Sequence, residues 1–246
     1  MVALNAPIWR QVSSAGNDAE KWLRRLLSGE GGFRENMEIL AEDLSHQMSY
    51  YNATAYVLPH LAALCGRLSL GERHFLISQT GAAIAAEGET PLVPDTTEYR
   101  EFHEGLDGLR PVAADLIQNH PEVLDAASGE EKQMFVLSAL AILGNRKHAF
   151  ALFMLSGSCW EEAPAVCSCG WEDECILIRE PDCCIEPAEI PAWDGKSLND
   201  EAVWVKGLLE RAGDEDIAPI IPLVYGTGVC PECGKREPYW NWNDRY

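Results

Sequence analysis

Positive charge is scarce in this chain, which has 19 Lys and Arg against 39 Asp and Glu and a formal net charge of -20. A field of this sign repels phosphate backbones, so we expect no direct binding of nucleic acid. The excess is concentrated late, because residues 156–229 contain sixteen acidic and four basic side chains. Such a surface attracts a basic partner and speeds association at low salt. The alternative is that the charge serves solubility or suits a salt-rich habitat.

Long apolar runs are also missing. The longest, residues 134–143, is too short to span a bilayer, and the first residues do not combine a basic leader with an apolar segment. We therefore expect a cytoplasmic protein with no membrane partner. The chain is nevertheless 47% hydrophobic over 246 residues, enough for one large domain or two modest ones.

Catalytic signatures are absent from the sequence. It contains no Gly-rich phosphate loop, no nucleophile elbow and no His-Glu-x-x-His motif, so we predict that the protein is not an enzyme. His46, His60 and His74 recur every fourteen residues, but Pro59 and Gly71 interrupt the pattern between them. We interpret the interval as chance, and His46 as a capping or packing residue.

Cysteine, in contrast, is plentiful, with nine residues. In a cytoplasmic protein these are expected as thiols or metal ligands rather than disulfides. The strongest motif is Cys230-Pro-Glu-Cys233-Gly234, because a glycine at this place allows the tight turn of a zinc knuckle. A closed tetrahedral site needs four ligands, so a second pair is required.

Cys167 and Cys169 are the second pair that we predict, with Cys175, Cys183 and Cys184 as possible substitutes. Four thiolates leave no open coordination position, so the expected zinc is structural and not catalytic. The alternative is that the cysteines serve a redox or metal enzyme.

Helical periodicity dominates residues 1–156, and no alternating strand pattern occurs there. After a loose lead-in over residues 1–16, the patterns predict helices at 17–28, 33–44, 44–65, 72–86, 97–119, 128–143 and 146–155. Pro59 should kink the third, and the fifth should break near Gly105 and Gly108 and restart at Pro111. Ser128 and Glu131 form a capping box, and residues 134–143 should be the most buried helix. The fold class is mainly α, an irregular solenoid or helical bundle.

The pattern changes after Gly157. Two short strand-like runs, residues 165–169 and 175–179, predict a hairpin with Cys167 and Cys169 at its tip, and a helix follows at residues 201–212 with Val203, Leu208 and Leu209 inward. We therefore divide the chain into a helical domain, residues 1–156, and an acidic, cysteine-bearing α+β module, residues 157–246.

Two segments resemble a known family, through His46-Gln47, Tyr50 or Tyr51, Ala53-Thr54 and Pro59, and through Leu223-Val-Tyr-Gly226 followed by Cys230-Pro-Glu-Cys233-Gly. They are similar to bacterial HEAT-like helical-repeat proteins, several of which end in a Cys-Pro-x-Cys-Gly element. The resemblance implies a HEAT-like α-solenoid with a zinc-stapled C-terminal module. Members of this family are often encoded in toxin and immunity gene neighbourhoods, which suggests an interaction protein.

These observations predict a protein-binding protein, an immunity or neutralising partner that occludes a basic toxin domain after electrostatically steered association. The acidic residues expected to meet the partner are Glu172, Asp173, Glu174, Asp214, Glu215 and Asp216. A scaffold in another bacterial complex is the alternative in the same class.

Overall fold

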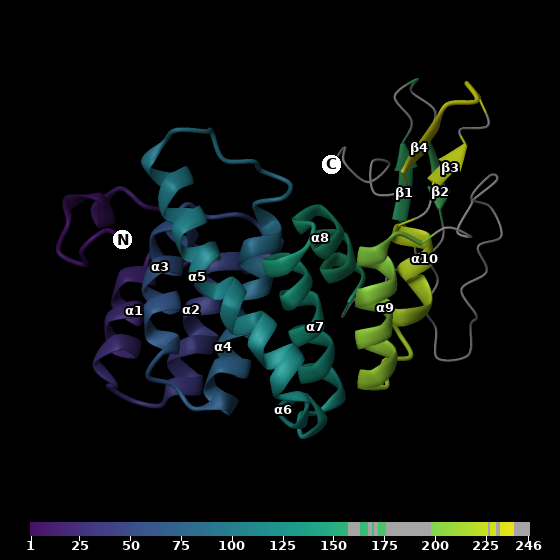
Figure 1. Cartoon of the computed structure of the whole chain (residues 1–246). Coiled ribbons are helices and arrows are strands. Elements are labelled where there is room, and N and C mark those ends of the chain that lie inside the picture. The colour runs from purple at the N-terminus through teal and green to yellow at the C-terminus, as the bar shows by residue number, and fades with distance from the viewer. Residues whose placement is uncertain are drawn as a thin grey trace. The chain divides into compact units, whose positions relative to one another are not determined.

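The computed structural model describes residues 1–156, 163–166, 169, 172–175, 198–225, 227–229 and 232–238, which are mainly helical (Figure 1). The chain divides into two compact units, Met1–Phe150 and Ala151–Tyr246. None of the described helices is both long and apolar enough to cross a membrane.

The first unit is built from helices with short connections. In chain order they are η1 (Pro7–Arg10), α1 (Ala19–Ser28), α2 (Phe33–Ser45), η2 (His46–Met48), α3 (Ala53–Cys65), α4 (Leu70–Ala86), α5 (Thr97–Asn119), α6 (Pro121–Asp125), α7 (Gly129–Leu143) and α8 (Arg146–Leu155), which continues past the boundary.

Capping boxes start two of these helices. Ser128 Oγ accepts from the Glu131 N–H at 3.2 Å and Glu131 Oε2 accepts from the Ser128 N–H at 3.0 Å, which confirms the predicted box before α7. Ser69 and Glu72 form the same arrangement before α4, although the sequence analysis did not identify it. Each box satisfies backbone donors that the first turn leaves without a helical partner.

α5 is continuous from Thr97 to Asn119, so the predicted break near Gly105 is wrong. A Cβ at Gly105 would lie 2.4 Å from Leu58 Cβ and 2.7 Å from Pro59 N, and one at Gly108 would lie 2.7 Å from Ala62 Cβ. These glycines therefore bring α5 close to α3 instead of ending the helix. Figure 1 shows the two helices side by side.

α4 and α7 approach each other equally closely at Gly81. A Cβ there would lie 2.0 Å from Ser138 Oγ and 2.3 Å from Ser138 Cα. The buried Ser138 hydroxyl donates to the Ser78 carbonyl at 2.8 Å. The contact thus combines close packing with a satisfied buried polar group.

The most buried helix is α3 and not the predicted segment at residues 134–143. α7 is buried without interruption from Phe135 to Ile142, but α3 is buried from Ala53 to Leu61 and again at Leu64 and Cys65. α1, α4 and α5 all pack on α3, which explains its burial.

The predicted helix over residues 44–65 begins only at Ala53. Gln47 and Met48 have left-handed backbone angles, with φ of 53° and 56°, which ends the helical path. Tyr50 follows and donates its hydroxyl to Glu98 Oε1 at 3.0 Å. Burial, helped by the Glu98 carboxylate, raises the Tyr50 pKa, so the phenol stays protonated.

The first sixteen residues are fixed, in contrast to the predicted loose lead-in. Trp9 is buried, and the Ser13 N–H donates to Asn52 Oδ1 at 2.6 Å. Farther on, the Ser14 hydroxyl donates to the buried Asp43 carboxylate at 2.6 Å, and the Asp18 N–H donates to it at 3.2 Å. Polar side chains of α2 and of Asn52, the residue before α3, therefore hold this segment.

A buried ion pair joins the end of α4 to the start of α8. The Glu87 carboxylate, 5% exposed, lies against the Arg146 guanidinium, close but not aligned as a hydrogen bond. Arg146 also lies over the Phe102 ring, 5.6 Å from its centroid. Paired charges of this kind are needed where a carboxylate is buried.

Besides the end of α8, the described residues of the second unit contain two antiparallel strand pairs and three helical segments. They are β1 (Ala163–Val166) with β2 (Glu172–Cys175), α9 (Asp200–Ala212), η3 (Ala218–Ile220), α10 (Ile221–Val224), and β3 (Thr227–Val229) with β4 (Arg236–Pro238).

α9 starts at the Asn199 cap, whose side chain accepts from the Ala202 N–H at 2.8 Å, and ends at Gly213 with φ of 74°. Leu208 and Leu209 are buried as predicted, but Val203 is 57% exposed and was wrongly placed inward. The second strand of the hairpin begins at Glu172, within the residues that were expected to form its loop.

Candidate functional site

The predicted zinc ligands fall only in part on described residues. Cys167 and Cys230 lie outside them, whereas Cys169 and Cys233 are exposed. Cys169 belongs to the connection between β1 and β2, whose register pairs Val166 with Glu172. Cys233 belongs to the connection between β3 and β4.

The glycine that follows Cys233 has a left-handed backbone. Gly234 has φ of 71°, a left-handed conformation that residues with a Cβ rarely adopt. Val229 pairs with Arg236 across the strand pair, so six residues, 230–235, join the strands. A short connection with such a glycine suits two thiolates turned toward one ion.

The substitute ligands are placed less fully. Cys175 is the last residue of β2 and pairs with Ala163, and Cys183 and Cys184 lie outside the described residues. Within the part of the chain that the structure describes, no three His, Cys, Asp or Glu side chains gather to hold a metal.

The acidic residues predicted to meet a partner separate into different roles. Glu172, Asp173 and Glu174 form most of β2. Asp214 has a structural role, because its Oδ1 accepts from the N–H groups of Asp216, Ile217 and Ala218 at 3.1, 2.6 and 3.0 Å.

Glu215 and Asp216 are exposed directly after Asp214. The cap formed by Asp214 fixes the backbone on which these two side chains stand. Among the predicted acidic residues whose exposure the structure describes, these two are exposed.

The three evenly spaced histidines lie in different surroundings. His46 is exposed beside Glu42, with a close contact between its Nδ1 and the Glu42 carboxylate. His60 and His74 are both buried. Burial lowers the pKa of His74, whose ring stacks on Phe135 with centroids 4.4 Å apart and whose Nε2 has no hydrogen-bond partner.

Cys65 is a buried thiol on α3. Its Sγ donates to the Leu61 carbonyl at 3.3 Å, and burial raises its pKa to about 11. A thiol that stays protonated is a poor nucleophile and a poor metal ligand, so Cys65 offers no support for thiol chemistry at this position.

A cleft of about 360 Å³ opens between the start of α1 and the end of α2. Its lining comprises Ala15, Gly16, Asp18, Trp22, Ile39, Glu42, Asp43 and His46. Asp43 is occupied in holding the loop before α1, and Asp18 pairs with Lys21 at 3.1 Å. Most of the polar groups in the cleft thus already form hydrogen bonds or ion pairs within the protein.

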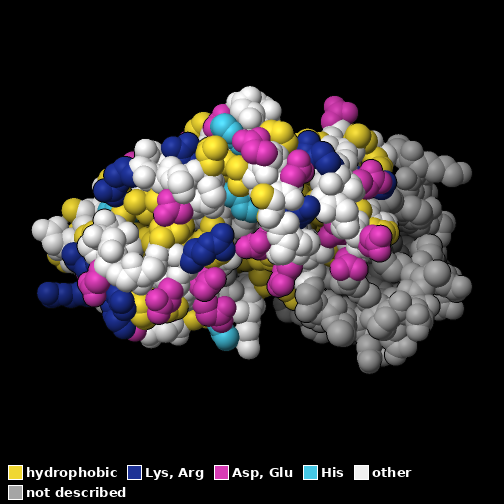
Figure 2. All heavy atoms as spheres, turned by 90° about the horizontal axis from the view of Figure 1, so that it is seen from below, with side chains coloured by type: hydrophobic (Ala, Val, Ile, Leu, Met, Phe, Trp, Pro, Cys, Tyr) yellow, Lys and Arg dark blue, Asp and Glu magenta, His cyan; other side chains and the backbone are white. Residues whose placement is uncertain are grey.

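Acidic, basic and apolar side chains are interspersed on the face of the described residues that Figure 2 shows. Residues 1–150 contain 20 acidic and 12 basic side chains, and residues 151–246 contain 19 and 7. The shorter unit therefore carries the stronger acidic excess.

Comparison of this chain with protein-family models, curated proteins and solved structures finds no match.

Proposed function

We propose that the protein is a binding protein that neutralises a basic protein, such as a toxin domain, by covering its active surface. The observation that carries the proposal is the net charge of -20, more than half of which lies in residues 156–229, with sixteen acidic and four basic side chains. Charge of this size and sign raises the rate of encounter with a cationic partner and disfavours nucleic acid.

The helical unit suits the role of a rigid support. Its helices are fixed by capping boxes and close glycine contacts. On this proposal it is a HEAT-like solenoid, and the exposed carboxylates Glu215 and Asp216 contribute to steering the partner. Binding then acts by steric occlusion and needs no catalytic group.

Zinc belongs to the proposal as a structural ion held by Cys167, Cys169, Cys230 and Cys233. The left-handed Gly234 and the short β3–β4 connection support the knuckle half of this site. The four thiolates would fix the C-terminal module, since binding of a structural zinc is itself folding free energy.

Native mass spectrometry of the reduced protein, co-expressed with the products of its neighbouring genes, tests both parts. We expect one zinc per chain and a bound basic protein whose association rate falls steeply with salt. Recovery of the bare protein, or of a complex insensitive to salt, would contradict the proposal.

Matched charge variants locate the steering residues. Glu215→Gln should lower the association rate constant and leave thermal stability unchanged, since the side chain is exposed. Asp214→Ala should instead destabilise the turn by about 1–2 kcal/mol, because it removes the acceptor of three N–H groups. An unchanged rate in Glu215→Gln would remove this residue from the interface.

Cys233→Ser tests the zinc site, with Cys65→Ala as the control. The first variant should lose zinc and unfold the C-terminal module, whereas the second should retain one zinc and lose only the stability due to a buried thiol. Full zinc content and an unchanged melting temperature in Cys233→Ser would exclude Cys233 as a ligand.

A further inference from the structure

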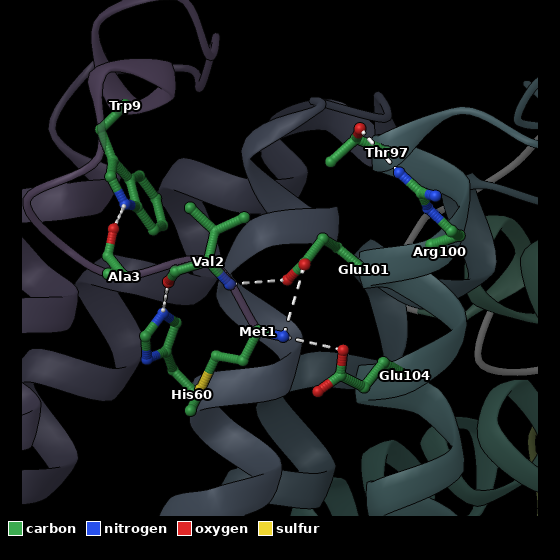
Figure 3. Close-up of polar contacts among 9 residues, drawn as sticks. All are labelled: Met1, Val2, Ala3, Trp9, His60, Thr97, Arg100, Glu101 and Glu104. Carbon is green, nitrogen blue, oxygen red and sulfur yellow. Dashed lines mark hydrogen bonds and ion pairs between the residues drawn. The ribbon is translucent and has the colours of Figure 1, made fainter.

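The first ten residues form a strap across α3 and α5, and Figure 3 shows how its beginning is held. The Val2 N–H donates to Glu101 Oε2 at 2.9 Å, and the Val2 carbonyl accepts from His60 Nε2 at 2.8 Å. One residue of the strap is therefore bound through both of its backbone polar groups, by a side chain of α5 and a side chain of α3.

Two further contacts fix the strap on either side of Val2. The Met1 ammonium lies 2.8 Å from Glu104 Oε2 and 3.4 Å from Glu101 Oε1. The buried Trp9 ring meets Tyr56 edge to face, with centroids 6.2 Å apart. A cation and an aromatic anchor thus flank the hydrogen-bonded backbone.

The strap seat, defined as Tyr56, His60, Glu101 and Glu104, contains buried polar groups that need a peptide. His60 and Glu101 are 7% and 9% exposed, and the hydrogen bonds found for their side chains go to Val2. A buried carboxylate or imidazole gives up its hydrogen bonds to water, and this costs free energy unless another partner replaces them. The seat therefore matches the N–H and the carbonyl of a peptide backbone at this position.

The protonation of His60 suits this task. Burial lowers its pKa, so the ring is neutral near pH 7 and carries a single ring proton. Because Nε2 faces a carbonyl oxygen, that proton lies on Nε2 and is donated to the strap. The Glu101 carboxylate thus accepts from the N–H of Val2, and the His60 imidazole donates to its carbonyl.

We propose that the strap seat is a peptide-binding site, and that the strap is its built-in competitor for a peptide segment of a partner. The segment would carry a positive charge to meet Glu101 and Glu104, and an aromatic residue to replace Trp9. The basic character of this partner rests on the proposed function, whereas the peptide chemistry rests on the contacts of the strap alone.

Competition follows from the covalent attachment of the strap. A tethered segment acts at an effective concentration of about millimolar, so a free peptide binds only after overcoming it. Loosening the strap increases the fraction of seats that are vacant. The apparent affinity of a free peptide rises in proportion to that fraction.

The probe is a synthetic peptide with the sequence of residues 1–11, titrated into the ¹⁵N-labelled full-length protein. Trp9→Ala removes the aromatic anchor of the strap, and Val2→Pro removes the N–H that Glu101 accepts. We expect saturable amide shifts on α3 and α5 in both variants, with an apparent affinity at least tenfold above that of the wild type. Using two variants guards against misfolding of either.

Two controls show whether binding takes place at the seat. A peptide with proline at its second position should fail to bind, and Glu101→Gln in the Trp9→Ala background should weaken binding at least fivefold. Glu38→Gln, an exposed change on α2, should have no effect.

Absence of saturable binding to both loosened variants, equal binding to wild type and variants, or indifference to Glu101→Gln would overturn the proposal. These outcomes are separate from those for the proposed function. A basic partner captured with unchanged affinity by Trp9→Ala and Glu101→Gln variants would leave that function standing and exclude the seat. Peptide binding without capture of any partner would support the strap seat and contradict the proposed function.

Discussion

Two helix pairs in the first unit come equally close at a glycine but are assembled by different means. α4 and α7 each begin with a capping box, and Ser138 joins them by a hydrogen bond to Ser78. α3 has no side-chain cap, because its preceding residue Asn52 accepts from Ser13 instead. α4 and α7 thus begin with signals coded within a few residues, whereas α3 depends on segments distant in sequence.

The buried histidines show the same contrast. His60 on α3 is satisfied by the strap, which lies 58 residues away in sequence. His74 on α4 has no partner for Nε2 and is held by stacking on Phe135 of α7. The histidine of the α3–α5 pair therefore has a hydrogen-bond partner from a distant segment, whereas Nε2 of the histidine in the α4–α7 pair has none.

The largest expected effect comes from adding a methyl group at the two glycine contacts. Gly81→Ala and Gly105→Ala should each destabilise the protein by about 3 kcal/mol or more, because the new Cβ meets backbone atoms that cannot turn aside. Gly71→Ala is the control in α4, where a Cβ meets nothing within 4 Å and should be neutral or stabilising. Urea unfolding measures the three free energies, and equal values for Gly71 and Gly81 would contradict the close contact.

A smaller effect separates local from distant coding. Ser128→Ala should lower the free energy of unfolding by about 1 kcal/mol by deleting the cap of α7. Asn52→Ala should mainly destabilise residues 13–18, since the Asn52 side chain accepts hydrogen bonds from Ser13. Hydrogen exchange distinguishes the two, with faster exchange at the start of α7 in the first variant and at residues 13–18 in the second. The reverse pattern would refute the contrast.

The smallest effect is a dependence of stability on pH. Burial lowers the pKa of His74, with Glu131 opposing this and Arg34 adding to it, so the unfolded chain binds a proton more readily than the folded one. The contribution of neutral His74 to the free energy of unfolding should therefore be fully present above about pH 6.5 and decrease as the pH falls below that value.

His74→Phe keeps an aromatic ring in the stack and removes the titrating group. The variant should show a flatter decline of unfolding free energy between pH 7 and 5, measured by urea unfolding at each pH. His60→Phe gives the matched comparison, because burial also lowers the pKa of His60. A decline as steep in both variants as in the wild type would show that other groups cause it.

Local signals account for the parts of the fold that the sequence predicted. The Ser128 capping box and the apolar run after it led directly to α7, and the same Ser-x-x-Glu spacing at Ser69 would have placed the start of α4 correctly. The mainly helical class followed from periodicity throughout residues 1–156.

The errors came from residues whose roles are set by distant contacts. Gly105 has the appearance of a helix breaker until its neighbour α3 is known, and the first residues have no period because side chains of α3 and α5 hold their backbone. The capping role of Asp214, which accepts from three N–H groups of its own turn, was also missed, and its contact with a partner stays a prediction.

The ion pair between Glu87 and Arg146 decides where the chain can be cut. A fragment that stops at the end of α7 would lose the counter-charge of Glu87 and the cation above Phe102. We therefore expect a fragment of the helical unit that keeps the first turn of α8 to be more stable than one that ends at Leu143.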